Sequence, residues 1–287
     1  MIEEILHVLI EGLKLLPFLF LSYLIIELIE HKSSKKMEEK LKKSGVFGPI
    51  IGSILGLVPQ CGFSVTASNL YAGRVITIGT LIAVFLSTSD EAIPIFVSHP
   101  ESIGKLLPLL LIKFIVALVI GIVIDFIYRK KHTLKEEVEE LDEHIHDMCS
   151  HCHCSDKNIL VSSIKHTLSV FLFILIVLYV LHIAIHLVGE DNLSKILMQG
   201  SVFQPIIASL IGLIPNCASS VLLTELYLAG TISFGSILAG LLTGAGIGIA
   251  VLFRINKPQK DNFKILGIVY GVGVITGLIT QFIQFLF

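Results

Sequence analysis

One stretch of this chain occurs twice, and the repetition limits the folds that are open to it. Residues 48–71 read GPIIGSILGLVPQCGFSVTASNLY, and residues 204–227, 156 positions further on, read QPIIASLIGLIPNCASSVLLTELY. The copies share Pro, Gly and Cys residues, which match by chance far less often than Ile and Leu in apolar sequence. The shared positions include Pro49/Pro205, Gly56/Gly212, Pro59/Pro215, Cys61/Cys217, Ser64/Ser220 and Tyr71/Tyr227. The chain is therefore a duplicated unit.

The composition places this duplicated unit in a membrane. Hydrophobic residues make up 54% of the 287 and charged residues 15%, and the mean hydropathy is +0.86. These values are too apolar for a soluble domain of this length. Several apolar runs of about 20 residues or more are long enough to cross a hydrocarbon core of roughly 30 Å. The lipid bilayer is the expected partner, and no basic aromatic surface indicates nucleic acid.

The positions of Lys and Arg predict the topology. The basic loops 30–47, 129–158 and 254–264 are predicted to be cytoplasmic, because positive charge is retained on that side. The spans are expected at residues 5–29, 75–97, 103–128, 159–188, 232–253 and 263–287, with Pro94 and the polar residues 87–91 interrupting the second. Pro59 and Pro215 divide the repeated stretches into arms of about 11 to 13 residues, each too short to cross at 1.5 Å per residue. Each repeated stretch is predicted to be a re-entrant hairpin with its tip near mid-membrane.

The predicted fold is an all-α integral membrane protein built as an inverted repeat. Each half has three spans plus one Pro/Cys-broken re-entrant hairpin, which gives 8 to 10 helical segments. Three crossings are an odd number, so the halves, residues 1–131 and 159–287, face opposite ways. A cytoplasmic acidic and His/Cys-rich loop at residues 132–158 joins them, and the expected location is the cell (inner) membrane. Many secondary transporters have this plan.

The hairpin tips and a polar run in the second span form the candidate substrate or ion pathway. Irregular backbone at membrane depth is tolerated only when it is buried in protein or lines a cavity. Carboxylates at that depth are functional candidates because they are costly there. The pathway residues are Gln60, Cys61, Ser64, Asn69, Ser87, Thr88, Ser89, Asp90, Glu91, Asn216, Cys217, Ser220 and Glu225.

Several roles in this pathway stay open. Cys61 and Cys217 either ligate a soft ion or trivalent arsenic as thiolates, or are small packing residues at the helix breaks. Glu225 takes the position of Asn69, so the expected site is symmetric in backbone and asymmetric in charge. Lys113 is either a counter-charge to the buried acids or part of ion coupling.

A tract in the central loop is typical of transition-metal binding. Its candidate ligands are His144, His146, Cys149, His151, Cys152, His153 and Cys154. Such Cys/His tracts bind soft or borderline metals. The protein is expected to require no cofactor, and a metal on this loop would be sensed, buffered or delivered there, or bound incidentally.

The motifs also resemble those of a known family. The two tip motifs PQCGFS and PNCASS, the run STSDEAIP at residues 87–94 and the His/Cys loop are similar to those of the ten-helix heavy-metal exporter family, labelled arsenic efflux or manganese transport proteins. The likeness extends over nearly the whole chain. It implies an inner-membrane permease that expels a metal or metalloid. Manganese fits unevenly, since Mn²⁺ prefers oxygen ligands, whereas the cysteines favour softer ions.

The function predicted from these observations is secondary active export of a heavy-metal cation or metalloid, of the Mn/Zn divalent type or an arsenic species. The site would lie between the hairpin tips, and transport would be coupled to protons or to membrane potential. No nucleotide-binding Gly-rich Lys motif and no catalytic constellation occurs, so the chain is predicted not to be an enzyme. One alternative is a permease for a small organic anion or metabolite with a metal-sensing loop. Another is a membrane-bound metal sensor or assembly partner without transport.

Overall fold

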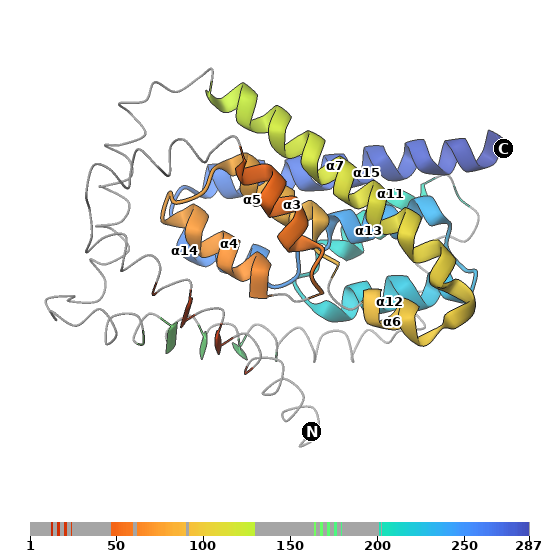
Figure 1. The fold of residues 1–287 in the computed structure, drawn as a ribbon, viewed down its shortest axis with the longest axis horizontal. Helices are drawn as coiled ribbons and strands as arrows, with labels where there is room; N and C mark the ends of the chain where they lie inside the picture. The colour runs from red at the N-terminus through yellow and green to blue at the C-terminus, as the bar shows by residue number, and fades with distance from the viewer. Residues whose placement is uncertain are drawn as a thin grey trace, which may run out of the picture.

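The computed structural model describes residues 47–59, 62–89, 92–129, 201 and 203–286, with isolated helical positions between 13 and 24 and between 164 and 179. Every regular element in these ranges is helical (Figure 1). The prediction of an all-helical fold is therefore confirmed for the described residues. The central His/Cys loop, most of the first and fourth predicted spans, and residues 60, 61, 90 and 91 lie outside them.

The two halves contain the same helices in the same order. The first half has α3 (Gly48–Gly56), α4 (Gly62–Ala72), α5 (Ile78–Ser87), α6 (Ala92–Ser98), the 3₁₀ turn η1 (Pro100–Ser102) and α7 (Ile103–Arg129). The second half has α11 (Gln204–Gly212), α12 (Cys217–Leu228), α13 (Phe234–Thr243), α14 (Gly248–Ile255) and α15 (Gln259–Leu286). Four of the five helix pairs begin at positions equivalent in the two repeats, so the duplication extends well beyond the shared motifs.

Equivalent hydroxyls begin the central helix of each half. Thr77 caps α5 by accepting a hydrogen bond from the backbone N–H of Thr80, and Ser233 caps α13 in the same way from Ser236. Such a cap satisfies one of the N–H groups that a helix start leaves without a partner. The same local chemistry therefore sets the start of both core helices.

Glycines allow α3 to lie directly against α5. A Cβ on Gly52 would stand 2.9 Å from the carbonyl oxygen of Thr80, and one on Gly56 would stand 2.6 Å from that of Val84. Since the contacts advance along both helices together, α3 and α5 run in the same direction. In the chain, α4 connects the end of α3 to the start of α5. Gly212 meets Gly240 and Thr243 in the same way, so α11 and α13 repeat the arrangement. Re-entrance of these hairpins into a bilayer stays a prediction.

The longest helix of each half packs antiparallel to its core helix. A Cβ on Gly79 would meet Gly121 on α7, and a Cβ on Gly235 would meet Gly277 on α15. Asp125 of α7 fastens the start of α5, because its carboxylate accepts from the Gly79 N–H at 2.8 Å and from the Thr77 hydroxyl at 2.7 Å. The α3–α5–α7 layer and the α11–α13–α15 layer are thus built alike.

The remaining short helices cross over to the other half. Helix α4 packs against α14, and α12 packs against α6, as Figure 1 shows at the two ends of the molecule. Phe96 of α6 and Tyr227 of α12 meet with ring centroids 6.1 Å apart. Among the described residues, each half therefore packs part of its surface against the other half.

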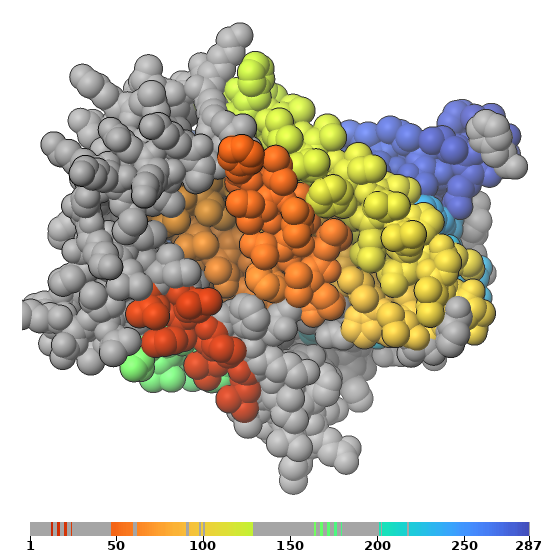
Figure 2. Space-filling view, viewed as in Figure 1, coloured from red at the N-terminus to blue at the C-terminus, as the bar shows by residue number. Residues whose placement is uncertain are grey.

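Within the part of the chain that the structure describes, four segments are long and apolar enough to cross a membrane: Ile78–Val97, Ile103–Tyr128, Phe234–Ile255 and Gln259–Leu286. The first and third form the core, where Leu81, Phe85 and Leu238 are fully buried. Helices α7 and α15 instead expose apolar side chains such as Leu111 and Ile275, as lipid-facing helices do. Helix α3 also reaches the surface beside α7 (Figure 2).

Some boundaries differ from the prediction. Pro94 does not interrupt a helix; it lies in the first turn of α6, where a missing N–H costs nothing. The last span begins at Gln259, earlier than the predicted residue 263. The helices that follow the breaks at Pro59 and Pro215 begin at Gly62 and Cys217.

Candidate functional site

Four breaks in the backbone lie between short helices, two in each half. They separate α3 from α4, α5 from α6, α11 from α12 and α13 from α14. Each break leaves carbonyl groups at one helix end and N–H groups at the next without intrahelical partners. The candidate site is therefore built largely from backbone groups, and the side chains around the breaks determine what can bind there.

Lys113 joins the α5/α6 break to the end of α13. Its side chain extends from α7 and is fully buried. The Nζ group donates to the carbonyl oxygen of Thr88, the C-cap of α5, and to that of Leu241 in the last turn of α13 at 2.6 Å. A cation at a helix C-terminus is favourable, and here one ammonium group serves two such ends. The C-terminal ends of two half-helices, one from each half, therefore meet at Lys113.

The polar run after α5 is buried and folded back on its own backbone. The hydroxyl of Ser87 donates to the carbonyl of Ala83 at 2.8 Å, and that of Thr88 to Val84 at 2.7 Å. The Ser89 hydroxyl donates to the carbonyl of Ser87 at 3.1 Å. These bonds end the helix and keep the break in place. Asp90 and Glu91, the predicted ion-binding carboxylates, follow directly and lie outside the described residues.

The N-terminal ends of α4 and α14 meet on one side of this centre. The Ser68 hydroxyl donates to the carbonyl oxygens of Ser64 and Gly248, both at 2.8 Å. A Cβ on Gly248 would stand 2.7 Å from the Cβ of Ser64, so this approach requires glycine. Two helix starts in contact present N–H groups to the same region, which favours polar or negatively charged groups there.

The second hairpin tip has a capping residue at its centre. Asn216 is buried, and its Oδ1 accepts from the Ala218 N–H at 3.1 Å to begin α12. The Ser219 hydroxyl donates to the Asn216 carbonyl at 2.8 Å, and Thr224 bonds back to Ser220. The predicted pathway residue Asn216 is thus held in place as a helix cap. Gln60, Cys61 and the side chain of Cys217 lie outside the described residues, so the thiol role stays a prediction.

Asn69 and Glu225 occupy equivalent positions but different surroundings. Asn69 is fully buried on α4, whereas Glu225 is exposed on α12. The structure therefore does not bring Glu225 into the buried centre around Lys113. Its role in ion binding or proton transfer stays a prediction.

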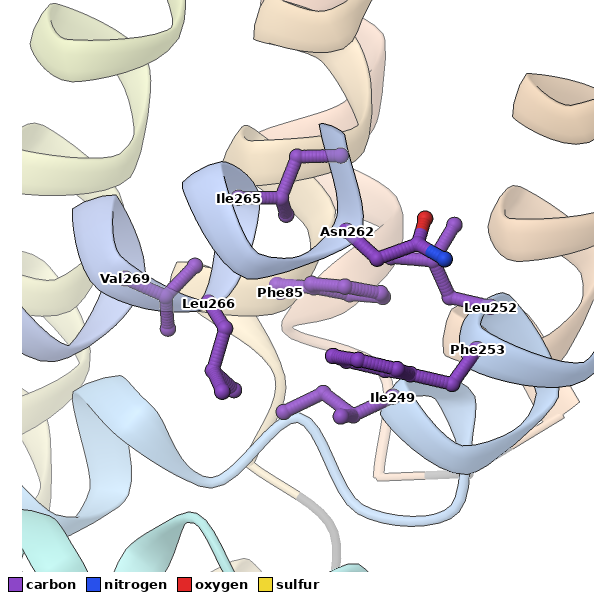
Figure 3. A pocket seen from close by; sticks show the side chains of 8 residues that line it. All are labelled: Phe85, Ile249, Leu252, Phe253, Asn262, Ile265, Leu266 and Val269. Carbon is purple, nitrogen blue, oxygen red and sulfur yellow. The ribbon is translucent and has the colours of Figure 1, made fainter. Parts of the chain in front are cut away.

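The pocket drawn in Figure 3 is a gap in the packing and not a substrate site. It is lined by Phe85 of α5 and by residues of α14 and α15, and it is too small to admit a water molecule. Its one polar residue, Asn262, is already hydrogen-bonded to Asn256. Within the described residues no group of three His, Cys, Asp or Glu side chains is placed to hold a metal ion. The predicted His/Cys ligands lie outside those residues.

Sequence reasoning missed two features of this region. The break at residues 244–247 was expected to be continuous helix, although Gly244 and Gly246 and the equivalence to residues 88–91 are signals for it. The sequence shows Lys113 as a charge inside an apolar span, but its contact with both halves cannot be predicted from the sequence alone.

Comparison with known proteins identifies the family. A family described as "Putative, 10TM heavy-metal exporter", ArsP_2, matches the chain over residues 13–167 and 155–285. The chain belongs to this family. No curated protein and no solved structure matches it.

Membership in the 10TM heavy-metal exporter family confirms the predicted resemblance and supports a role as a membrane transporter. The family is not a class of enzymes, and its members are multi-span membrane proteins, in agreement with the four apolar segments found here.

Proposed function

We propose that this chain is a secondary active exporter of a heavy-metal cation or metalloid, either a Mn/Zn-type divalent ion or an arsenic species. The proposed site lies at mid-membrane between the two hairpin tips, beside the α5/α6 break. Transport is coupled to protons or to membrane potential. Family membership supports the transporter class, and the junction at Lys113 supports the location of the site.

The proposal includes an inverted repeat. Helix α5 begins at the end of α7 that carries Asp125, while α13 begins at the end of α15 that carries Gln281. The two core helices then converge on Lys113 with their C-terminal ends. This convergence is expected if the halves enter the membrane from opposite faces. Broken helices that meet near the midplane are the usual binding architecture of secondary transporters.

The proposed roles of the side chains follow the chemistry of the donors. Asp90 and Glu91 would bind a divalent ion or carry protons, with Glu225 as a further acid on the route. Cys61 and Cys217 would contact a soft ion or arsenic. The His/Cys loop would bind a transition metal on the cytoplasmic side of the inner membrane and present or sense the cargo.

The experiment is a total-metal profile of cells that express this chain, measured against an empty vector under subtoxic Mn, Zn, Co, Ni, Cu, Cd and arsenite. Selective depletion of one element is the expected result. The depletion should be lost with Asp90→Asn or with Cys61→Ser. Gly267→Ala, on α15 where a new Cβ meets nothing within 4 Å, is the matched control and should deplete the same element.

One observation favours a second candidate, a permease for a small organic anion. The α4 and α14 N-termini meet beside the centre and the buried cation Lys113 lies in it, and both attract negative charge. In proteoliposomes this candidate predicts flux that is indifferent to chelators and to deletion of residues 144–154. An unchanged metal profile with folded protein would favour it over metal export. Metal binding by the loop without any flux would instead indicate a sensor.

A further inference from the structure

Two contacts between the halves lie at opposite ends of the molecule. At one end the Tyr71 hydroxyl, in the last turn of α4, donates to Asp261 at the start of α15 at 2.5 Å. At the other end the Lys105 ammonium, at the start of α7, lies 5.4 Å from the ring centroid of Tyr227 in the last turn of α12. Lys105 and Asp125 lie on the same helix, separated by about 30 Å at 1.5 Å per residue, and Asp125 marks the Tyr71 end.

The two contacts use equivalent positions of the repeat. Tyr71 corresponds to Tyr227, and Lys105 corresponds to Asp261. In both, a tyrosine at the end of one half's hairpin meets a charged residue at the start of the other half's longest helix. The geometry differs because the charge has opposite sign. The carboxylate of Asp261 accepts a hydrogen bond from the tyrosine hydroxyl, whereas the ammonium of Lys105 lies over the face of the tyrosine ring.

The two contacts also have different surroundings, ionic at one end and aromatic at the other. Arg74 stands 5.2 Å from the ring centroid of Tyr71 and 3.9 Å from the Asp261 carboxylate, so this end is held by polar and ionic contacts. At the opposite end Tyr227 packs between Phe96 and Phe234, at centroid distances of 6.1 and 6.0 Å. The first end carries arginines and lysines of the loops predicted to be cytoplasmic, so the positive-inside rule predicts that it faces the cytoplasm.

We infer that these contacts are the closing contacts of two gates, Tyr71–Asp261 toward the cytoplasm and Lys105–Tyr227 toward the outside, which open alternately during transport. The inference rests on the proposed transport function. Each contact closes a seam between the halves, α4 against α14 and α15 at one end and α12 against α6 and α7 at the other. Both are formed at once here, as in an occluded state between two open ones. A substitution that breaks one contact destabilises the conformation closed at that end relative to the one open there. The population therefore shifts toward the conformation open on that side.

Equivalent buried residues behind the two gates supply matched reporters. Ser68 lies behind the cytoplasmic contact on α4, and Thr224 is its equivalent behind the outer contact on α12; both are fully buried. Ser68→Cys or Thr224→Cys is introduced into protein whose five native cysteines are Ser. The rate of labelling by a membrane-impermeant maleimide is then measured from each side in inverted and right-side-out vesicles.

The expected result is reciprocal. Asp261→Asn should raise labelling at position 68 from the cytoplasmic side several-fold and leave position 224 unchanged. Lys105→Met should do the reverse from the outer side. Phe263→Ala removes an edge-to-face contact with Phe253 inside one half, at 5.1 Å, and should change neither rate. Equal labelling of each reporter in all backgrounds, or a rise on the wrong side, would overturn the inference.

A cross-link makes a second measurement, in which the cytoplasmic gate is held closed. Tyr71→Cys with Asp261→Cys is joined by a reducible bifunctional thiol reagent, and transport should stop and return after reduction. The pair Phe253→Cys with Phe263→Cys, cross-linked within one half, should continue to transport. Full transport through the cross-linked 71/261 pair would refute the gate. Because labelling needs no cargo, gate-dependent labelling combined with no metal flux through the wild-type chain would reject the proposed export function and leave the gates standing.

Discussion

The two halves of this protein share a backbone and differ in charge. Thr77 and Ser233 cap equivalent helices, and in both halves glycines allow the first hairpin helix to pack closely against the core helix. The buried charges have no such symmetry, because Lys113 corresponds to Val269 and Asp125 to Gln281. The duplicated backbone thus supplies the breaks and their orientation. The positions at which the halves differ therefore determine the charge at the centre.

The largest effect is expected where one half supplies a charge for both. Lys113→Met removes the donor from the carbonyls of Thr88 and Leu241 and leaves two buried acceptors without it. A buried group that loses its partner costs about 1–3 kcal/mol. The variant should unfold at a clearly lower temperature in detergent and lose transport in the metal-profile assay.

Lys264→Met is the matched control for that substitution. Lys264 is exposed and lies 5.1 Å from the Tyr128 ring centroid. An exposed cation–π contact contributes only about 0.5–1 kcal/mol, so the unfolding temperature of this variant should stay near that of the wild type. If the two variants unfold at the same temperature, Lys113 does not hold the halves together.

The sequence predicts most of the framework and little of the centre. The repeat and the prolines at the hairpin tips can be read directly from the sequence, and within the described residues helices lie close to where these signals predict them. The break at residues 244–247 carries no proline or charge, so the signals for it are weaker: two glycines, Gly244 and Gly246, and the alignment with residues 88–91. The partners of Lys113 lie 25 and 128 residues away in the chain, and long-range pairs of this kind leave no periodic pattern.

The candidate site shows the same limit. Asn216 was expected to line the pathway as a polar side chain in the membrane, but the cap of α12 already uses its oxygen. Glu225 was expected in the pathway because carboxylates are costly at membrane depth; its side chain is exposed on α12, and its role stays a prediction. A polar residue in an apolar segment indicates a constraint, and only packing distinguishes a structural constraint from a functional one.

A smaller effect is expected at the glycine contacts, and the second half should be the more sensitive. Gly212→Ala places a Cβ 2.1 Å from the Gly240 carbonyl oxygen, which belongs to the backbone of α13. Gly56→Ala places its closest contact, at 2.0 Å, on the Ser87 hydroxyl, which can rotate, although the Val84 carbonyl at 2.6 Å also resists. Overpacking of this kind costs about 1–3 kcal/mol.

Thermal unfolding of the two alanine variants should therefore rank Gly212→Ala below Gly56→Ala, with both below wild type. Gly267→Ala is the control on α15, where nothing lies within 4 Å of the new Cβ. It should be neutral or stabilising by up to about 1 kcal/mol, because alanine favours helix. Equal stability of all three variants would contradict the close packing of α3 on α5 and of α11 on α13.

The smallest loss of stability is expected at the helix caps, where the two halves should also differ. Thr77→Ala and Ser233→Ala each remove one cap, a loss of about 0.5–2 kcal/mol. The Thr77 hydroxyl also donates to Asp125, so Thr77→Ala leaves a buried carboxylate with one fewer donor. The corresponding bond of Ser233 is made by its backbone N–H, which donates to Gln204 Oε1, so Ser233→Ala does not remove it. Thr77→Ala should therefore lower the unfolding temperature more than Ser233→Ala. Thr77→Ser, which keeps the hydroxyl, should restore most of that difference; failure to restore it would mean that the methyl group, and not the bond to Asp125, distinguishes the two caps.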